Sequence, residues 1–289
     1  MNSCYSVAGL EFCIEGEQLN APFYINYAPF RLEKRSGSPL LFKMVFTKLP
    51  PMTIQPSRVY HSELGEYHIY IGEKTCDIVC RLASSARLYR LSANRQWSYI
   101  EVDMDFLQIE DFMVLNDFIM FAFIYSSAFY NTVLLHASCL RYKESGVAFM
   151  GASGVGKSTH SHLWLKYIEG AILLNDDQPA VRLLEGKPYI CGTPWSGKTA
   201  CYRNQQAELK IIFAMEQAQE NKMTRLSPLG FFQQLLASCS LIREDEKSFD
   251  KITKTLSAIV KHVQAFQFKN RPDKTAVELS FYTLFGNNE

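Results

Sequence analysis

The most informative stretch of this 289-residue chain is Gly151-Ala152-Ser153-Gly154-Val155-Gly156-Lys157-Ser158, which matches the pattern G-x-x-x-x-G-K-[S/T] at every position. Glycines let a backbone turn tightly, so that successive N–H groups point inward at phosphate oxygens. In this pattern the lysine reaches the β- and γ-phosphates and the terminal hydroxyl ligates Mg²⁺. The octapeptide therefore predicts a phosphate-binding loop, with Thr159 directly after it.

The residues on both sides of the octapeptide supply the context that such a loop needs, a strand before it and a helix after it. Residues 146–150 are a short apolar run typical of a buried strand. Residues 158–168 carry Leu163, Trp164 and Tyr167 at helical spacing. A glycine-rich turn without a ligand is the alternative, and this context disfavours it.

Bulk composition indicates a globular protein of one large or two modest domains. The hydrophobic content of 47% is ample for a core, and the net charge of +1 gives no reason to expect binding to nucleic acid or to an anionic membrane. The eight cysteines are scattered, which favours small buried side chains in a reducing cytosol over a zinc site. The first residues carry no basic segment of a signal peptide. We therefore expect a cytoplasmic protein.

One apolar segment, residues 112–135, raises the alternative of a membrane helix. Asn116, Asp117 and Asn131 interrupt it, and a charged aspartate in the middle of a bilayer is costly. We expect instead a buried helix over residues 110–130, followed by a strand over residues 133–141, and no membrane partner.

The rest of the chain indicates two parts. Residues 1–108 predict a small antiparallel β-rich module, with strands in the runs 5–14, 31–46, 67–71, 78–82 and 97–102. Residues 109–289 predict an α/β domain built around the loop. Helices are expected there over residues 228–242, 245–263 and 275–284, with a strand at 264–268.

Candidate partners of the loop are acidic. Asn175-Asp176-Asp177 directly follows the short apolar run 172–174, and two carboxylates at a strand end can divide metal binding and proton acceptance. An ordinary polar turn is the alternative. His136 lies within the apolar run 134–139, where it must find polar partners. It is either a core histidine or a ligand or carboxylate partner at the site.

The sequence around these residues resembles the HPr kinase/phosphorylase family and its relative, phosphoenolpyruvate carboxykinase. The resemblance covers residues 133–181: the loop 151–158, a histidine on the preceding strand (His136), and an Asp-Asp pair after the loop helix (Asp176 and Asp177). A weaker likeness to uncharacterised bacterial HPr-kinase-related proteins continues through residues 192–198, 209–216 and 225–227. It implies a mixed-sheet P-loop core of the HPr kinase/carboxykinase type.

The resemblance also implies roles. Residues 151–159 would hold the phosphates of ATP or GTP, with Lys157 bridging them, and Ser158 and Asp177 would hold Mg²⁺. Asp176 would be the general base, although the two branches differ in how the aspartates share the work, and His136 would orient the carboxylate or ligate metal. Lys198 and Arg203 are candidates for stabilising phosphate charge. The substrate-contacting signature of the kinase/phosphorylase family is missing after the Asp pair, so HPr itself is not implied as the substrate.

These residues together predict an ATP- and Mg²⁺-dependent kinase that transfers the γ-phosphate to a hydroxyl, with Ser or Thr of a small protein or peptide as the first acceptor. Three alternatives stay open: a small-metabolite kinase, for instance of free serine; a nucleotide-binding regulatory subunit without turnover; and an interaction protein in which the loop is accidental. The resembled kinases often form oligomers, so a homo-oligomer is a further expectation.

Overall fold

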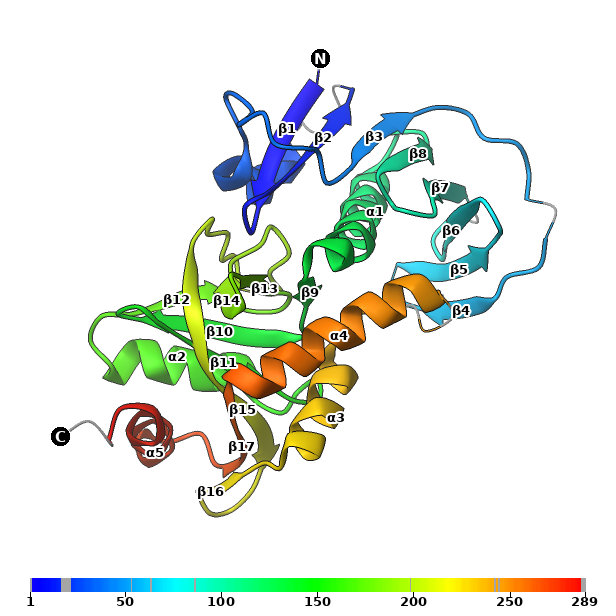
Figure 1. The fold of residues 1–289 in the computed structure, drawn as a ribbon. Coiled ribbons are helices and arrows are strands. Elements are labelled where there is room, and N and C mark those ends of the chain that lie inside the picture. Colours follow the sequence, from blue (N-terminus) through cyan, green and yellow to red (C-terminus); the bar gives the residue numbers. More distant parts are fainter. Residues whose placement is uncertain are drawn as a thin grey trace. The chain divides into compact units, whose positions relative to one another are not determined.

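The computed structural model describes residues 2–16, 22–52, 54–62, 64–85, 87–197, 199–241, 243 and 245–286 (Figure 1). The chain divides into two compact units. Unit 1 holds residues 1–130 and 241–250, and unit 2 holds residues 131–240 and 251–289. The division differs from the boundary expected at residue 108, because the apolar helix after that residue packs within unit 1. Unit 2 contains the octapeptide.

Unit 1 is built on a sheet with the strand order β1-β2-β3-β8-β7-β6-β5-β4 among the described residues. Its strands are β1 (Asn2–Val7), β2 (Leu10–Glu15), β3 (Lys43–Phe46), β4 (Arg58–His61), β5 (Gly65–Ile71), β6 (Thr75–Leu82), β7 (Leu88–Asn94) and β8 (Tyr99–Asp103). The expectation of an antiparallel module is wrong: β3 runs parallel to both β2 and β8. The connection from β2 to β3, which includes the 3-10 segment η2 (Pro22–Phe30), is long enough to return the chain in that direction.

The run expected as one strand over residues 5–14 is a hairpin. Its two-residue turn, Ala8-Gly9, has φ angles of +52° and +71°, the left-handed pair that matches the twist of the flanking strands. The hairpin register places Cys4 opposite Cys13, and these two form a disulfide. The interpretation of all eight cysteines as reduced is therefore wrong for this pair. The other six, Cys76, Cys80, Cys139, Cys191, Cys201 and Cys239, are free thiols.

The apolar helix α1 (Ile109–Ser127) is a core element of unit 1. It begins where the Asp111 carboxylate accepts hydrogen bonds from the backbone N–H groups of Leu107 and Gln108. Residues Ile109–Tyr130 have the length and hydropathy of a membrane span, a test that buried core helices also pass, and 61% of the tested window is buried. Phe123 meets Phe12 of β2 edge-on, and Tyr125 packs on Trp97. The expected buried helix over residues 110–130 is thus confirmed to within a few residues.

Unit 2 is built on a second mixed sheet. Among the described residues its order is β12-β10-β11-β15-β14-β13-β9, with β17 added beside β15 and β16 beside β17. The strands are β9 (Thr132–Leu134), β10 (Ala137–Tyr142), β11 (Ser145–Met150), β12 (Ala171–Asn175), β13 (Ala180–Leu184), β14 (Lys187–Cys191), β15 (Gln206–Gln217), β16 (Lys222–Arg225) and β17 (Gln264–Asn270). β15 is parallel to β11 and to β17, and the remaining pairs are antiparallel.

Helices complete unit 2: α2 (Lys157–Tyr167), α3 (Pro228–Ser238), α5 (Lys274–Phe285) and the part of α4 (Glu246–His262) that follows residue 250. Trp164 of α2 is fully buried, and its indole N–H donates to the Ser280 hydroxyl of α5 at 2.8 Å. Phe149 of β11 stacks on Phe213 of β15 beneath them. Phe149 also meets the Trp164 ring edge-on, so the strand before the octapeptide packs against the helix after it.

The strand expected over residues 133–141 is two strands. β9 pairs with β13 at one edge of the sheet, whereas β10 pairs with β11 and β12. The chain changes neighbours at Leu135-His136, where the Leu135 N–H donates to Pro179 O and the His136 N–H donates to Ser238 O. The apolar run did not reveal this break, which takes the His136 side chain out of the alternation of a continuous strand.

Asp117 gives unit 1 a pH-dependent stability. Burial raises the pKa of its carboxyl to about 6, opposed by the hydrogen bond that Tyr67 donates to it at 2.5 Å. Because the folded pKa lies above the unfolded value of about 3.9, the contribution of Asp117 to stability is fully present below pH 4. It is lost as the pH rises through 6. Its side chain keeps part of its surface in solvent, so about 3 kcal/mol is an upper bound.

We expect the free energy of unfolding of the natural protein, minus that of Asp117→Asn, to fall by up to about 3 kcal/mol between pH 4 and pH 7. Urea unfolding of both proteins at the two pH values measures this difference, and the subtraction removes the contributions of other titrating groups. A difference that stays constant over this range would show that Asp117 does not titrate as its surroundings require.

Candidate functional site

The octapeptide forms a tight loop between β11 and α2. Gly151, Gly154 and Gly156 have φ angles of +149°, +78° and +102°, a region that glycine enters without strain. Gly156 is the residue immediately before α2, so the loop leads directly to the N–H groups of the first helical turn. Those groups and the helix dipole favour an anion. The strand, loop and helix expected over residues 146–168 are thus present.

Two of the three glycines differ in their surroundings. A Cβ on Gly151 would lie 3.0 Å from the carbonyl oxygen of Met215 in β15 and 2.9 Å from the Val155 side chain. A Cβ on Gly154 would meet nothing within 4 Å. Gly151 is therefore required both by its backbone angle and by the close approach of β15, whereas Gly154 is required by its angle alone.

The remaining loop residues lie at the surface or at its margin. Ala152, Ser153 and Thr159 are exposed, and Val155 and Ser158 are half-buried. The backbone carbonyl of Ser158 is hydrogen-bonded to His162 Nδ1 at 2.7 Å, within α2. The small side chains of this stretch leave the loop open to solvent on its outer face.

Lys157 is buried at 8% exposure, and its ammonium group has three partners. Nζ lies 2.9 Å from the Gly151 carbonyl oxygen, 3.2 Å from that of Ala152 and 3.1 Å from His136 Nε2. Three acceptors take up the three protons of an ammonium. Burial lowers the pKa of Lys157, and the negative charges of Asp177 and Asp176 oppose that effect.

His136 joins this lysine to the acidic turn, the segment Asn175-Asp176-Asp177 at the end of β12. Its Nδ1 lies 2.9 Å from Asp177 Oδ1, on the side of the ring opposite Nε2. Because the ammonium can only donate, Nε2 accepts and Nδ1 carries the proton that it donates to Asp177. The interactions therefore run from Lys157 through His136 to Asp177. The sequence expectation of a carboxylate partner for His136 is met by this contact.

Asp176 faces another direction. It is 6% exposed, and both of its oxygens accept hydroxyl hydrogen bonds, from Ser138 at 2.6 Å and from Thr199 at 2.5 Å. Ser161 of α2 lies 2.6 Å from the Ser138 hydroxyl and extends this network. The side chain of Asp177, by contrast, is 34% exposed. The two adjacent carboxylates thus differ in access: Asp177 meets solvent, and Asp176 is enclosed by hydroxyl groups.

Asn175 holds the acidic turn in place, a role that its residue type alone did not reveal. Its side chain is fully buried, and Oδ1 accepts the backbone N–H groups of Asp177 at 2.9 Å and Gln178 at 2.8 Å. Its Nδ2 donates to Trp195 O at 3.0 Å and to Thr193 Oγ1 at 3.1 Å. Asparagine satisfies both sides because it carries a donor and an acceptor. These contacts on both sides of the amide identify this function.

The segment that Asn175 contacts repeats the sequence pattern of the loop: residues 192–199 also read G-x-x-x-x-G-K-T. Here the pattern has another cause, because the next element among the described residues is the strand β15 and not a helix. A Cβ on Gly192 would lie 2.0 Å from the Arg203 carbonyl oxygen, and one on Gly197 would lie 3.2 Å from Asp177 Cβ. These glycines allow close packing beside the acidic turn.

Lys198 and Arg203 were the two residues predicted to stabilise phosphate charge. Lys198 lies outside the described residues. Arg203 is exposed, and its guanidinium lies near the Cys201 thiol, whose pKa it lowers against the larger effect of burial. Among the described residues no hydrogen bond or ion pair joins Arg203 to the octapeptide, so a role in phosphate binding stays a prediction.

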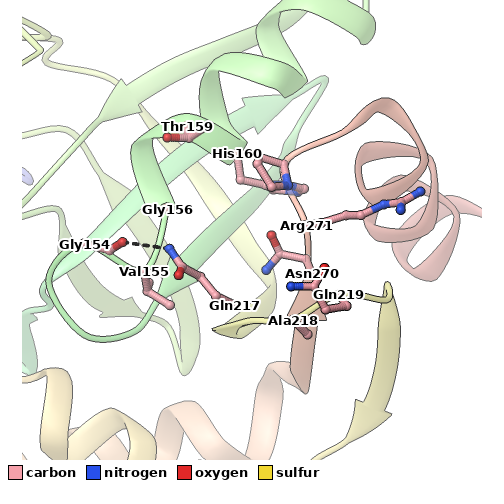
Figure 2. Close-up of a pocket in the computed structure, with 11 residues that line it drawn as sticks. Gly154, Val155, Gly156, Thr159, His160, Gln217, Ala218, Gln219, Asn270 and Arg271 are labelled. Atoms are coloured by element: carbon pink, nitrogen blue, oxygen red, sulfur yellow. Dashed lines mark hydrogen bonds between the residues drawn. The ribbon is translucent and has the colours of Figure 1, made fainter.

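A cavity of about 710 Å³ opens on one side of the loop (Figure 2). Its walls come from the loop, from the start of α2 and from the ends of β15 and β17: Gly154, Val155, Gly156, Thr159, His160, Gln217, Ala218, Gln219, Asn270, Arg271 and Pro272. The Gln217 side-chain amide donates to the Gly154 carbonyl at 3.1 Å and ties the loop to β15. This volume is in the range of sites for small organic ligands.

The described residues contain no group of three or more His, Cys, Asp or Glu side chains placed to hold a metal by themselves. The Ser158 hydroxyl and the aspartate carboxylates are nevertheless the oxygen donors that Mg²⁺ prefers. Magnesium at nucleotide sites typically has only one or two carboxylates, and substrate phosphates and water supply the rest. The donor chemistry therefore fits a metal carried in with a nucleotide.

No family model and no curated protein match this chain. Among solved structures it is similar to the HPr(Ser) kinase/phosphatase from Coxiella burnetii, with 16% sequence identity and a TM-score of 0.31. The similarity covers 53% of this chain and 88% of the bacterial one. A likeness of this size establishes no family, so the function is inferred below from the residues of this chain.

The backbone angles of Gly151 and Gly154 predict how their replacement changes the stability of the protein. We expect Gly154→Ala to destabilise the protein by about 1–2 kcal/mol, the cost of a left-handed backbone for a residue with a Cβ. Gly151→Ala is expected to cost more, because its Cβ also collides with the carbonyl oxygen of Met215. Denaturant unfolding of both variants measures the order, and equal losses would mean that β15 does not constrain the loop.

Proposed function

We propose that this chain is a phosphotransferase that binds a nucleoside triphosphate with Mg²⁺ and transfers the γ-phosphoryl group to a hydroxyl. The observation that supports this most is the connection Lys157–His136–Asp177, which joins the glycine-rich loop to an accessible carboxylate. A loop that serves only as a turn does not require a buried lysine that contacts a histidine, which in turn contacts a carboxylate. Phosphoryl transfer requires those elements: a phosphate cradle, positive charge and a proton acceptor.

The proposed pose follows from the loop. The triphosphate lies on the N–H groups of residues 151–159, and the nucleoside extends into the cavity beside Thr159 and Gln217. To reach the β- and γ-phosphates, the Lys157 ammonium exchanges at least one backbone carbonyl for a phosphate oxygen. Ser158 and one aspartate would hold Mg²⁺, which supplies charge neutralisation at the phosphates.

The geometry supports a division of labour between the aspartates that reverses the one implied by the family resemblance. Asp177 is the more exposed of the two, and one of its oxygens is held by His136, which leaves the other to take a proton. Each oxygen of Asp176 accepts one hydroxyl hydrogen bond, from Ser138 or Thr199, and the side chain is less exposed than that of Asp177. Its remaining lone pairs can still ligate a metal. We propose Asp177 as the proton acceptor and Asp176 as the carboxylate beside the metal.

In the proposed reaction the acceptor hydroxyl oxygen forms a bond to the γ-phosphorus, and the bond from that phosphorus to the β,γ-bridging oxygen breaks. The hydroxyl proton passes to Asp177, and the nucleoside diphosphate leaves with the bridging oxygen. His136 keeps the carboxylate oriented, and Lys157 meets the charge that develops on the phosphates. Positioning and charge stabilisation supply most of the rate, and a base adds about 10²–10⁴-fold.

A Ser or Thr side chain of a small protein or peptide is the acceptor that we propose first, in the cytoplasm and without a nucleic acid or membrane partner. Incubating the purified protein with γ-labelled ATP, Mg²⁺ and mixed peptides or free amino acids tests the acceptor class. Label on peptides supports the proposal, and label on free serine alone would indicate a small-metabolite kinase. Binding without transfer to any acceptor would indicate a regulatory subunit.

Lys157→Ala is expected to weaken ATP–Mg²⁺ binding strongly, because the loop loses the cation that bridges the β- and γ-phosphates. Isothermal titration of the natural protein and the variant measures this loss. Lys166→Ala, which changes an exposed lysine on the same helix, is the matched control and should bind as the natural protein does. Undiminished affinity in Lys157→Ala would remove the loop from nucleotide binding.

The two aspartates are expected to differ in their kinetic effects. Asp177→Asn should keep nucleotide binding and lose about 10²–10⁴-fold in kcat at every Mg²⁺ concentration, as a missing proton acceptor does. Asp176→Asn should instead require more Mg²⁺ for half-maximal rate. Transfer rates measured against Mg²⁺ separate the two effects. The opposite pattern would restore Asp176 as the base.

A further inference from the structure

Asn270, the last residue of β17, presents one side of its amide to the cavity beside the loop. The residue is 5% exposed and lines the cavity between the loop and Arg271 (Figure 2). Its backbone carbonyl accepts the Ala218 N–H at 3.0 Å, which fixes the ends of β15 and β17 against each other. The side chain therefore starts from a rigid position in the sheet.

The orientation of the Asn270 amide is determined by its neighbours. Nδ2 lies 3.4 Å from the Glu216 carbonyl oxygen and 3.3 Å from the Phe268 carbonyl oxygen. Carbonyl oxygens only accept hydrogen bonds, so the nitrogen must face them. The amide oxygen Oδ1 is then turned away from the backbone. It has no hydrogen-bond donor within the described part of the chain, and Figure 2 shows the amide directed toward the loop side of the cavity.

The lining carries few charges, and Asn270 Oδ1 differs from the other polar groups there in being fixed by the two backbone partners of its nitrogen. None of the lining residues is acidic, and Arg271 is the one lysine or arginine among them. Burial lowers the pKa of His160 to about 4, so this side chain is neutral at physiological pH. The side chains of Val155 and Pro272 supply apolar surface for a ring. Asn270 Oδ1 is thus a fixed, nearly buried acceptor in a cavity suited to a base.

We infer that Asn270 reads the base of the bound nucleotide and selects adenine over guanine, an inference that rests on the nucleotide site proposed above. Adenine carries an amino group at C6, which donates a hydrogen bond to Oδ1. Guanine and hypoxanthine carry a carbonyl oxygen at C6, which places two acceptors against each other. A site with a fixed polar group discriminates strongly against a ligand that leaves that group unpaired. The amide cannot turn over to adapt, because its nitrogen would then lose both backbone partners.

The test titrates the natural protein, with Mg²⁺, against four triphosphates that differ at C6: ATP, purine riboside triphosphate, ITP and GTP. ATP should bind about 3- to 10-fold more tightly than purine riboside triphosphate, which lacks the amino group. ITP and GTP should bind more weakly still. Equal affinities for all four would overturn the inference and leave the nucleotide site standing. No binding of any of them would instead contradict the proposed function.

A variant then assigns the preference to Asn270. In Asn270→Ala the advantage of ATP over purine riboside triphosphate should disappear, while the affinity for the latter stays within about 2-fold. Asn204→Ala, at an exposed position outside the cavity, should keep the full preference. A preference that persists in Asn270→Ala would overturn the assignment. The series on the natural protein decides the selectivity even where the variant fails to fold.

Discussion

The candidate site depends on the hydrogen bonds of one buried ammonium group, that of Lys157. Lys157 has three protons and three acceptors, two from the loop and one from His136, so its charge ties the loop to the strand break before β10. The strand breaks at Leu135-His136, and the imidazole of His136 lies between the lysine and Asp177. The connection on which the proposed chemistry relies therefore passes through a residue at a backbone irregularity.

Local patterns predicted the core of unit 2 well, because that core is built from neighbouring segments. The apolar run, the glycines and the helical spacing over residues 146–168 correspond to β11, the loop and α2. Unit 1 was less predictable. The Ala8-Gly9 turn falls within residues 5–14, which the sequence pattern predicted as a single strand. The parallel placement of β3 depends on pairings between segments distant in the sequence. The Cys4–Cys13 disulfide follows from that hairpin register.

The residues of the candidate site could be identified from the sequence where their pattern is rare, and less well where they are ordinary polar residues. The loop lysine, His136 and the Asp pair stand out by type and order, and the structure brings Lys157, His136 and Asp177 into contact. Ser138, Asn175 and Thr199 are ordinary residues whose functions come only from tertiary contacts. The same limit applies to residues 192–199, which match the loop pattern but pack against the acidic turn instead. A sequence pattern gives residue types and does not show which secondary-structure elements surround them.

A crystal structure with a non-hydrolysable ATP analogue and Mg²⁺ would show whether the loop and the aspartates act together on a triphosphate. We expect Lys157 Nζ to move from a loop carbonyl to an oxygen of the β- or γ-phosphate. We also expect Asp177 to face the γ-phosphorus and the base to lie in the cavity lined by Asn270. A triphosphate bound away from residues 151–158, or one bound there with Lys157 still on both carbonyls and Asp177 turned away, would contradict the proposed function.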